Sequence, residues 1–168
     1  APPPPARLRL DDADADARRR YLGLDASALE YLRTWTPIIA ARTPVVLDEF
    51  YAFLGAQAET ARLVPADVAE RLKRQVASYW RELSSGSFDQ GYAASRMRIG
   101  VIHERIGLGP SWYLAGLARQ IVGFARGLDP ADPDVVPRLQ ALVRAVCFDV
   151  SFVIDAYMDA RADRLLAL

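Results

Sequence analysis

His103 is the only histidine among the 168 residues of this chain, and it lies in an apolar run, RIGVIHERIGL. Helical spacing places three isoleucines on the same helix face as the imidazole: Ile99, Ile102 and Ile106. Three charged neighbours are expected largely off that face: Arg98, Glu104 and Arg105. A buried polar group without a partner costs about 1–3 kcal/mol. From this position alone, a hydrogen-bonded core histidine is a better interpretation than a metal ligand.

Other helix faces carry a few polar side chains that could share a site with His103. Tyr51 lies near Leu47 and Leu54 along its helix, so we expect its hydroxyl to point partly inward. A further face combines apolar and polar residues: Leu72, Gln75, Val76 and Tyr79. One imidazole, one phenol and one amide on apolar faces suit a large flat cofactor with a metal centre. Taken singly, each feature is better explained by core packing.

The type of metal site is limited by the number of available ligands. A single neutral imidazole can hold haem iron from one side. Zinc needs three or four protein ligands, and the sequence contains no such set. Covalent haem attachment is excluded because the CxxCH motif is missing. If His103 binds a metal, the sequence therefore favours non-covalent haem.

Proline, glycine and N-cap residues divide the chain into helices, and no run alternates as a strand would. We expect six helical segments, with a turn region at 55–64: about Asp25 to Ala41 with Pro37 bending or breaking it, Thr43 to Leu54, Pro65 to Leu83, Phe88 to Ile106, Pro110 to Gly127, and Pro137 to the end. These segments predict an all-α domain of about seven or eight helices over 21–168. Residues 1–20, which contain four successive prolines and alternating Asp and Ala, are predicted to form a mobile, extended lead-in.

The composition limits the class of partner and the compartment. Acidic and basic residues balance at 21 each, so nothing draws the chain as a whole to nucleic acid or to an anionic membrane. We find no apolar run long enough to span a bilayer and no signal-peptide centre. One cysteine, Cys147, cannot form an internal disulfide, which fits a reducing compartment. We therefore expect a cytoplasmic protein without nucleic-acid or membrane partners.

The last helix carries two apolar stripes, which predicts two buried faces. One stripe is Leu139, Leu142, Val146 and Val153, and the other is Val143, Cys147, Val150, Ile154 and Tyr157. We expect one stripe in the domain core and the other in a homodimer interface built from the last two helices. The later part of the second stripe, Val150 to Tyr157, is our choice for the partner face. The helix reaches the end of the sequence without a stop signal, so we expect it to lead into a C-terminal output domain.

The segment RMRIGVIHERIGLGPSWYLAGL resembles the signature of the globin-coupled sensors and their protoglobin relatives. The matching positions are Arg96, Arg98, Ile99, Ile102, His103, Arg105, Ile106, Gly107, Leu108, Pro110, Trp112 and Tyr113. DEFYAFL, which contains Tyr51, resembles the second-helix motif of the same family. The resemblance covers roughly Tyr21 to the end of the chain.

This resemblance implies a globin fold that holds haem b between the long helix and the histidine helix. His103 would be the proximal iron ligand, and Tyr51 the distal hydrogen-bond donor to bound oxygen. Leu72 would shape the distal pocket, and Tyr113 would lie near the proximal histidine. The further haem-contacting positions expected are Met97, Ile99, Ile102, Gln75 and Val76. Gln75 departs from the family, because some relatives have Ser or Thr there, and its amide could contact the ligand or leave the pocket.

The function implied by the resemblance is a haem-based sensor of O2, which would also bind CO and NO. The domain itself is then not an enzyme and signals to an output domain. An alternative is a haem enzyme, either a peroxidase or a dioxygenase that consumes NO. Peroxide cleavage benefits from a distal acid–base group, typically histidine, and none remains after His103. A helical interaction domain without cofactor is the third alternative.

Overall fold

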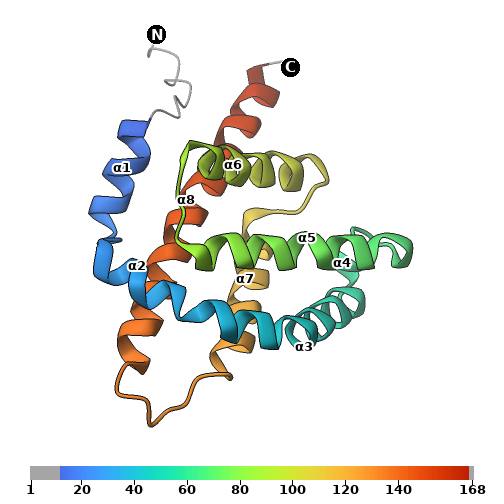
Figure 1. The fold of residues 1–168 in the computed structure, drawn as a ribbon. Helices are drawn as coiled ribbons and strands as arrows, with labels where there is room; N and C mark the ends of the chain where they lie inside the picture. The colour runs from blue at the N-terminus through green and yellow to red at the C-terminus, as the bar shows by residue number, and fades with distance from the viewer. Residues whose placement is uncertain (1–11, 167–168) are drawn as a thin grey trace.

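The computed structural model describes residues 12–166, which form eight helices and, within that range, no strand. The helices are α1 Asp12–Tyr21, α2 Ala26–Arg33, α3 Trp35–Ala56, α4 Ala58–Ala61, α5 Ala66–Ser85, α6 Gln90–Arg105, α7 Pro110–Ala125 and α8 Val135–Leu166. Figure 1 shows them in chain order, with α6 lying above α5 and α8 passing beyond α6 at its C-terminal end. The all-α prediction is confirmed. Within the described range, no helix combines the length and apolar character needed to cross a bilayer.

The predicted lead-in is wrong for residues 12–20, which belong to α1. Alanine favours helix, and Arg18 bonds Asp14 one turn earlier at 2.9 Å. Arg18 also reaches α8, where it lies 2.6 Å from Asp155 and stacks over the ring of Phe152. Helix α1 is therefore fixed to the domain by contacts that its own sequence does not reveal. The first part of the predicted lead-in, residues 1–11, lies outside the described range.

The first long segment divides at Thr34 and not near residue 42 as predicted. Asp25 is the N-cap of α2, as expected, and accepts a hydrogen bond from the Ala28 amide at 2.9 Å. The Thr34 hydroxyl bonds the Tyr31 carbonyl at 2.6 Å and ends α2. Pro37 then falls in the first turn of α3, where a missing N–H costs nothing. Helix α3 continues through Pro44 to Ala56, so Tyr51 lies on the same helix as Trp35.

The remaining helices agree with the predicted segments to within two residues. Gly86, with φ of 69°, ends α5 in the left-handed conformation. Asp89 caps α6 by accepting a hydrogen bond from the Tyr92 amide at 2.8 Å, and Gly107, with φ of 80°, follows its last turn. A one-turn helix, α4, lies inside the predicted turn region.

Aromatic side chains fill the core, and the two fully buried tryptophans among them have partners for their indole N–H groups. Trp35 donates to the Arg138 carbonyl at 2.8 Å, and Trp80 donates to Gln120 at 2.6 Å. Trp80 also packs edge-on against Phe124, with ring centroids 4.9 Å apart. These contacts join α3 to α8 and α5 to α7.

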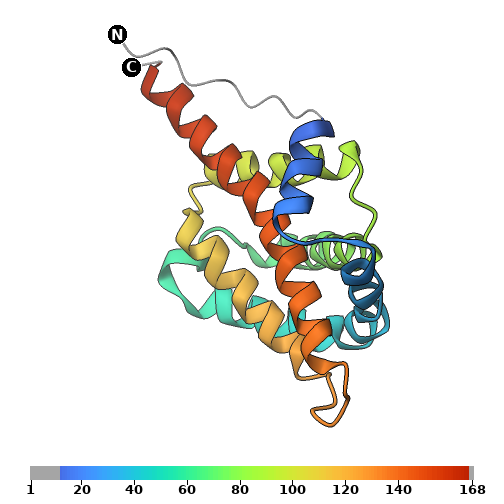
Figure 2. The same ribbon diagram turned by 90° about the vertical axis from the view of Figure 1, so that its left-hand side faces the viewer.

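Helix α6 crosses α8 at Gly100, and this crossing fixes the position of the histidine helix. A Cβ atom at residue 100 would lie 2.5 Å from the Val153 carbonyl oxygen and 2.8 Å from the Ala156 Cβ. Only glycine lets the two backbones approach this closely. Figure 2 shows α8 running diagonally, with α7 along one side and α1 along the other.

We predict that Gly100→Ala destabilises the domain by about 1–3 kcal/mol, because the added methyl group must push α6 away from backbone atoms of α8. Urea unfolding followed by circular dichroism measures the change. The matched control is Gly55→Ala in α3, where nothing lies within 4 Å of the added Cβ. The control is expected to leave stability unchanged or to raise it by up to about 1 kcal/mol. Equal stability of the Gly100→Ala variant and the wild type would contradict the close crossing.

Candidate haem site

His103 lies in the last turn of α6 and is mostly buried. Its Nδ1 atom is buried and has no hydrogen-bond partner among the described residues. Burial lowers the pKa of the imidazole to about 4. The ring is therefore neutral at pH 7, which is the form that binds a metal ion. The interpretation of His103 as a hydrogen-bonded core histidine finds no support here.

The buried face of α6 differs in part from the predicted one. Ile102 and Ile106 are 53% and 45% exposed, whereas Glu104 is buried. Glu104 was expected off the apolar face, but it pairs with Arg164 near the end of α8. The prediction failed because α6 turns its small and polar residues toward α8, where they meet polar partners that helical periodicity cannot anticipate. Met97 and Ile99 are half-buried against the core, as expected for residues beside His103.

Tyr113 of α7 lies directly beside His103. The ring centroids of the two side chains are 5.2 Å apart, with planes inclined at 46°. Tyr113 is buried, and its hydroxyl has no hydrogen-bond partner among the described residues. The structure thus places Tyr113 next to the imidazole, as the resemblance implies.

Tyr51 lies near the end of α3 and is half-buried, with its ring edge-on to Phe50 at 5.3 Å. Burial raises the pKa of the phenol to about 12, although the nearby ammonium group of Lys73 on α5 acts in the opposite direction. Tyr51 is therefore a neutral hydrogen-bond donor at physiological pH. Lys73 is itself held by Asp48 at 2.6 Å and Glu70 at 2.9 Å.

The α5 residues predicted for the pocket are not all equally buried. Leu72 and Val76 are half-buried, and Val76 packs against the core. Gln75 is exposed. No hydrogen bond joins Gln75 or Tyr51 to His103 within the described range, so the two sides of the site are separate groups of residues.

A cluster of buried polar residues behind His103 was not predicted as part of the site. Arg96 and Asp149 are both fully buried and pair at 3.0 Å, joining α6 to α8. The Arg96 guanidinium group lies 4.1 Å from the Tyr92 ring centroid and 4.4 Å from that of Tyr79. The Tyr92 hydroxyl donates to Asp149. The available signal was an aspartate as the one charged residue in the mainly apolar run AVCFDVSFVI.

The residues around His103 fit a haem held by one protein ligand. The imidazole is neutral, and because its Nδ1 faces the interior, Nε2 is the nitrogen that a metal can reach. Apolar side chains lie exposed on the same helix: Val101, Ile102 and Ile106. An exposed apolar surface beside an imidazole suits a flat apolar cofactor. Residues 12–166 contain no group of three His, Cys, Asp or Glu side chains arranged to hold a metal ion by themselves.

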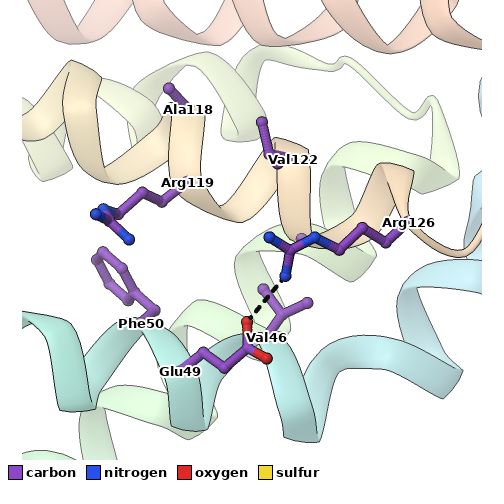
Figure 3. A pocket seen from close by; sticks show the side chains of 8 residues that line it. Val46, Glu49, Phe50, Ala118, Arg119, Val122 and Arg126 are labelled. Atoms are coloured by element: carbon purple, nitrogen blue, oxygen red, sulfur yellow. Dashed lines mark hydrogen bonds and ion pairs between the residues drawn. The ribbon is translucent and has the colours of Figure 1, made fainter.

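A cavity of about 260 Å³ lies elsewhere, between α3 and α7. Figure 3 shows Arg119 of α7 and Arg126, the residue after its last turn, facing α3, with an ion pair between Arg126 and Glu49. Neither His103 nor Tyr51 lines this cavity. The cavity is therefore separate from the candidate haem site.

Comparison with known proteins relates this geometry to a family. The Protoglobin family model matches residues 11–163. The chain belongs to the protoglobin family. This confirms the resemblance found in the run around His103, and it includes α1 in the family domain.

This chain resembles two known proteins. It is 31% identical over 173 residues to the heme-based aerotactic transducer HemAT of Halobacterium salinarum, covering 95% of this chain and 35% of that protein. The chain thus spans about a third of that relative. Its fold matches the globin domain of the Geobacter sulfurreducens globin-coupled sensor with a TM-score of 0.76 at 20% identity, covering 84% of this chain and 96% of that one. The predicted globin fold is confirmed.

We predict that His103→Ala abolishes tight haem binding, because no second imidazole exists in the chain. Haem content after purification and the Soret absorption of the reduced protein measure this loss. Added imidazole is expected to restore part of the absorption. The matched control is Arg105→Ala, an exposed residue in the same turn of α6, which should retain haem. Normal haem content in the His103→Ala protein would exclude His103 as the ligand.

Proposed function

We propose that this domain is a haem-based gas sensor whose ligand is O2. The observation that carries the proposal is the neutral, buried imidazole of His103, whose Nδ1 has no hydrogen-bond partner among the described residues. The exposed isoleucines beside it supply an apolar surface. Membership of the protoglobin family supports haem as the cofactor that covers this surface.

The haem iron would supply reversible binding of a diatomic gas. His103 would hold the iron through Nε2. Tyr51 keeps its proton, because burial raises the pKa of the phenol to about 12. Its neutral O–H group would be available as a hydrogen-bond donor to the gas, and such a bond is stronger toward a partly charged acceptor. Leu72 and Val76 of α5, with Met97, Ile99 and Ile102 of α6, would contact the porphyrin.

A sensing role is favoured over a haem enzyme by the chemistry of the distal side. Peroxide cleavage needs a group that exchanges protons near neutral pH. Tyr51, with a pKa of about 12, is a poor proton donor there, and the sequence has no second histidine. The related HemAT is a transducer by name. Steady-state consumption of NO or peroxide by the purified domain would instead support the alternative.

The proposed route for the signal is a homodimer that leads to a C-terminal output domain. Helix α8 carries an exposed apolar stripe along its length: Val136, Val143, Cys147, Met158 and Leu165. Val150 and Ile154 are half-buried between these positions. Burying a large apolar side chain of this stripe against a partner would stabilise the complex by about 1.5–3 kcal/mol. A second copy of the chain, related by a two-fold axis, would cover the stripe with the same stripe.

One residue of the predicted partner face belongs to the core instead. Tyr157 is 2% exposed, and its hydroxyl donates to the Leu108 carbonyl at 2.7 Å. Helix α8 turns this residue inward because Tyr157 follows Val153 by one turn, and Val153 faces α6. The proposed dimer face therefore moves toward Val143 and Cys147.

We predict that Tyr51→Phe raises the O2 dissociation rate about 3- to 30-fold, because one hydrogen bond to a partly charged acceptor is lost. The CO dissociation rate should change less. Both rates are measured by stopped-flow ligand replacement on the reduced haem protein. Tyr21→Phe, at a tyrosine 93% exposed on α1, is the matched control. An unchanged O2 rate would mean that another group, such as Gln75, holds the ligand.

We predict that Val143→Glu combined with Cys147→Lys gives a monomer that still binds haem. The two charges would lie in the apolar stripe of α8 and oppose its burial against a second copy. Sedimentation velocity gives the oligomeric state, and the Soret absorption gives the haem content. Val45→Glu is the matched control, because Val45 on α3 is 52% exposed and Val143 is 53% exposed. A wild-type monomer, or a double variant that remains dimeric, would refute the interface.

A further inference from the structure

Within the described range, three buried polar atoms near His103 and Asp149 have no hydrogen-bond partner. They are His103 Nδ1, the Tyr113 hydroxyl and the Tyr79 hydroxyl. The His103 and Tyr113 rings are 5.2 Å apart. Besides burial, the carboxylate of Asp149 raises the pKa of both Tyr79 and Tyr113, so both phenols lie within its field. A buried polar atom without a partner is destabilising, so hydrogen bonds among these side chains are favoured.

Asp149 lies at the opposite end of this group of side chains from His103, and its carboxylate is held by hydrogen bonds. One of its carboxylate oxygens accepts from the Tyr92 hydroxyl, and the other accepts from Arg96 Nε at 3.0 Å. Burial raises the pKa of Asp149, whereas Arg96 and the hydroxyls of Tyr92 and Tyr79 lower it. A guanidinium group does not lose its proton in proteins, so Arg96 stays charged between two carboxylates, Asp149 at 3.0 Å and the half-exposed Glu82 at 3.1 Å. Its contact with Asp149 favours the ionised form of this carboxylate. An ionised carboxylate only accepts hydrogen bonds.

We infer that Asp149 is a positioning residue for His103, which it controls through Tyr79 and Tyr113. In this chain of hydrogen bonds, Tyr79 donates to the carboxylate, Tyr113 donates to Tyr79, and His103 Nδ1–H donates to Tyr113. Side-chain shifts or a bridging water close the remaining gaps. The inference rests on the proposed function, because it takes His103 as the iron ligand.

The direction of the chain determines the state of the imidazole. Since the carboxylate can only accept hydrogen bonds, the Tyr79 and Tyr113 hydroxyls must each donate in the direction of Asp149. The oxygen of each hydroxyl then accepts a hydrogen bond from the next group in the chain. The last acceptor is the Tyr113 oxygen. For His103 to donate to it, the neutral imidazole must carry its one proton on Nδ1. The lone pair of Nε2 is left for iron, and the hydrogen bond at Nδ1 makes the ligand more basic. Four helices contribute: α5, α6, α7 and α8.

The test compares two phenylalanine variants in the reduced haem protein. Tyr79→Phe removes a hydroxyl that lies within the chain. Tyr92→Phe is the matched control, because it removes a hydroxyl on the same carboxylate but outside the chain. Both tyrosine rings flank Arg96 in the same way. The readout is the frequency of the iron–histidine stretch in resonance Raman spectra.

We expect the frequency to fall in Tyr79→Phe. Tyr113 would lose its connection to the carboxylate, so its oxygen would become a weaker acceptor for His103 Nδ1–H and the imidazole would become less basic. It should stay at the wild-type value in Tyr92→Phe. Asp149→Asn should shift it in the same direction as Tyr79→Phe, and the tyrosine variants decide the question if this variant fails to fold. An unchanged frequency in Tyr79→Phe, or an equal shift in both tyrosine variants, would overturn the inference.

Failure of the proposed function gives a different result. In that case the wild-type protein shows no iron–histidine stretch, or His103→Ala retains the wild-type haem content. If the wild-type stretch is present and haem is lost in His103→Ala, the proximal assignment stands. An unchanged frequency in Tyr79→Phe then removes only the role of Asp149.

Discussion

A buried ion pair between Arg96 and Asp149 holds the histidine helix against the last helix of the domain. Taking two charges out of water costs several kcal/mol per ion, and good geometry is needed to recover it. Here the carboxylate also accepts from Tyr92, and the guanidinium group lies over two aromatic rings. Removing Arg96 would leave the Asp149 carboxylate buried without a counter-charge, whereas Arg96 has a second partner in Glu82 at 3.1 Å. The position of α6, and with it that of His103, depends on this pair.

The close approach of α6 and α8 explains why the pair can form. Gly100 lies one turn beyond Arg96 on α6, and the close approach of the helix backbones there lets Arg96 reach Asp149 on α8. Farther along α6, Glu104 pairs with Arg164. Polar contacts thus lie on both sides of the glycine crossing. The histidine is held between helices whose relative position is closely determined.

Local signals in the sequence predicted most helix ends, because capping is a short-range effect. Asp25 is the N-cap of α2, as predicted. The ends at Gly86 and Asp89 lie close to the predicted ones, although the Asp89 cap itself was not predicted. Helix α1 was missed, because its stability depends on Arg18 reaching residues more than a hundred positions away. The division at Thr34 was missed because Pro37 and Pro44 were each interpreted as a helix boundary. Pro37 instead lies in the first turn of α3, and α3 continues through Pro44.

The sequence predicted the site residues that belong to a rare residue type or to the family motif. It did not predict the residues whose contacts lie on distant helices. A single histidine in the chain directed attention to residue 103, and the family motif supplied Tyr51 and Tyr113. Nothing in the local spacing revealed that Glu104 turns inward or that Asp149 faces α6. Helical periodicity assigns polar residues to water. It fails wherever two helices exchange polar groups across a shared interface.

The contact at Gly100 also has a mechanical consequence. Side chains normally act as a compliant layer between packed helices, because they can change rotamer when a helix shifts. Here the backbone of α6 meets the Val153 carbonyl without such a layer. Protein interiors are hardly compressible, so a small displacement of α6 must move α8 instead of being absorbed. The contact at Gly100 is therefore rigid. A sub-ångström shift of α6 changes the angle of α8, and the change extends along all 32 residues of that helix.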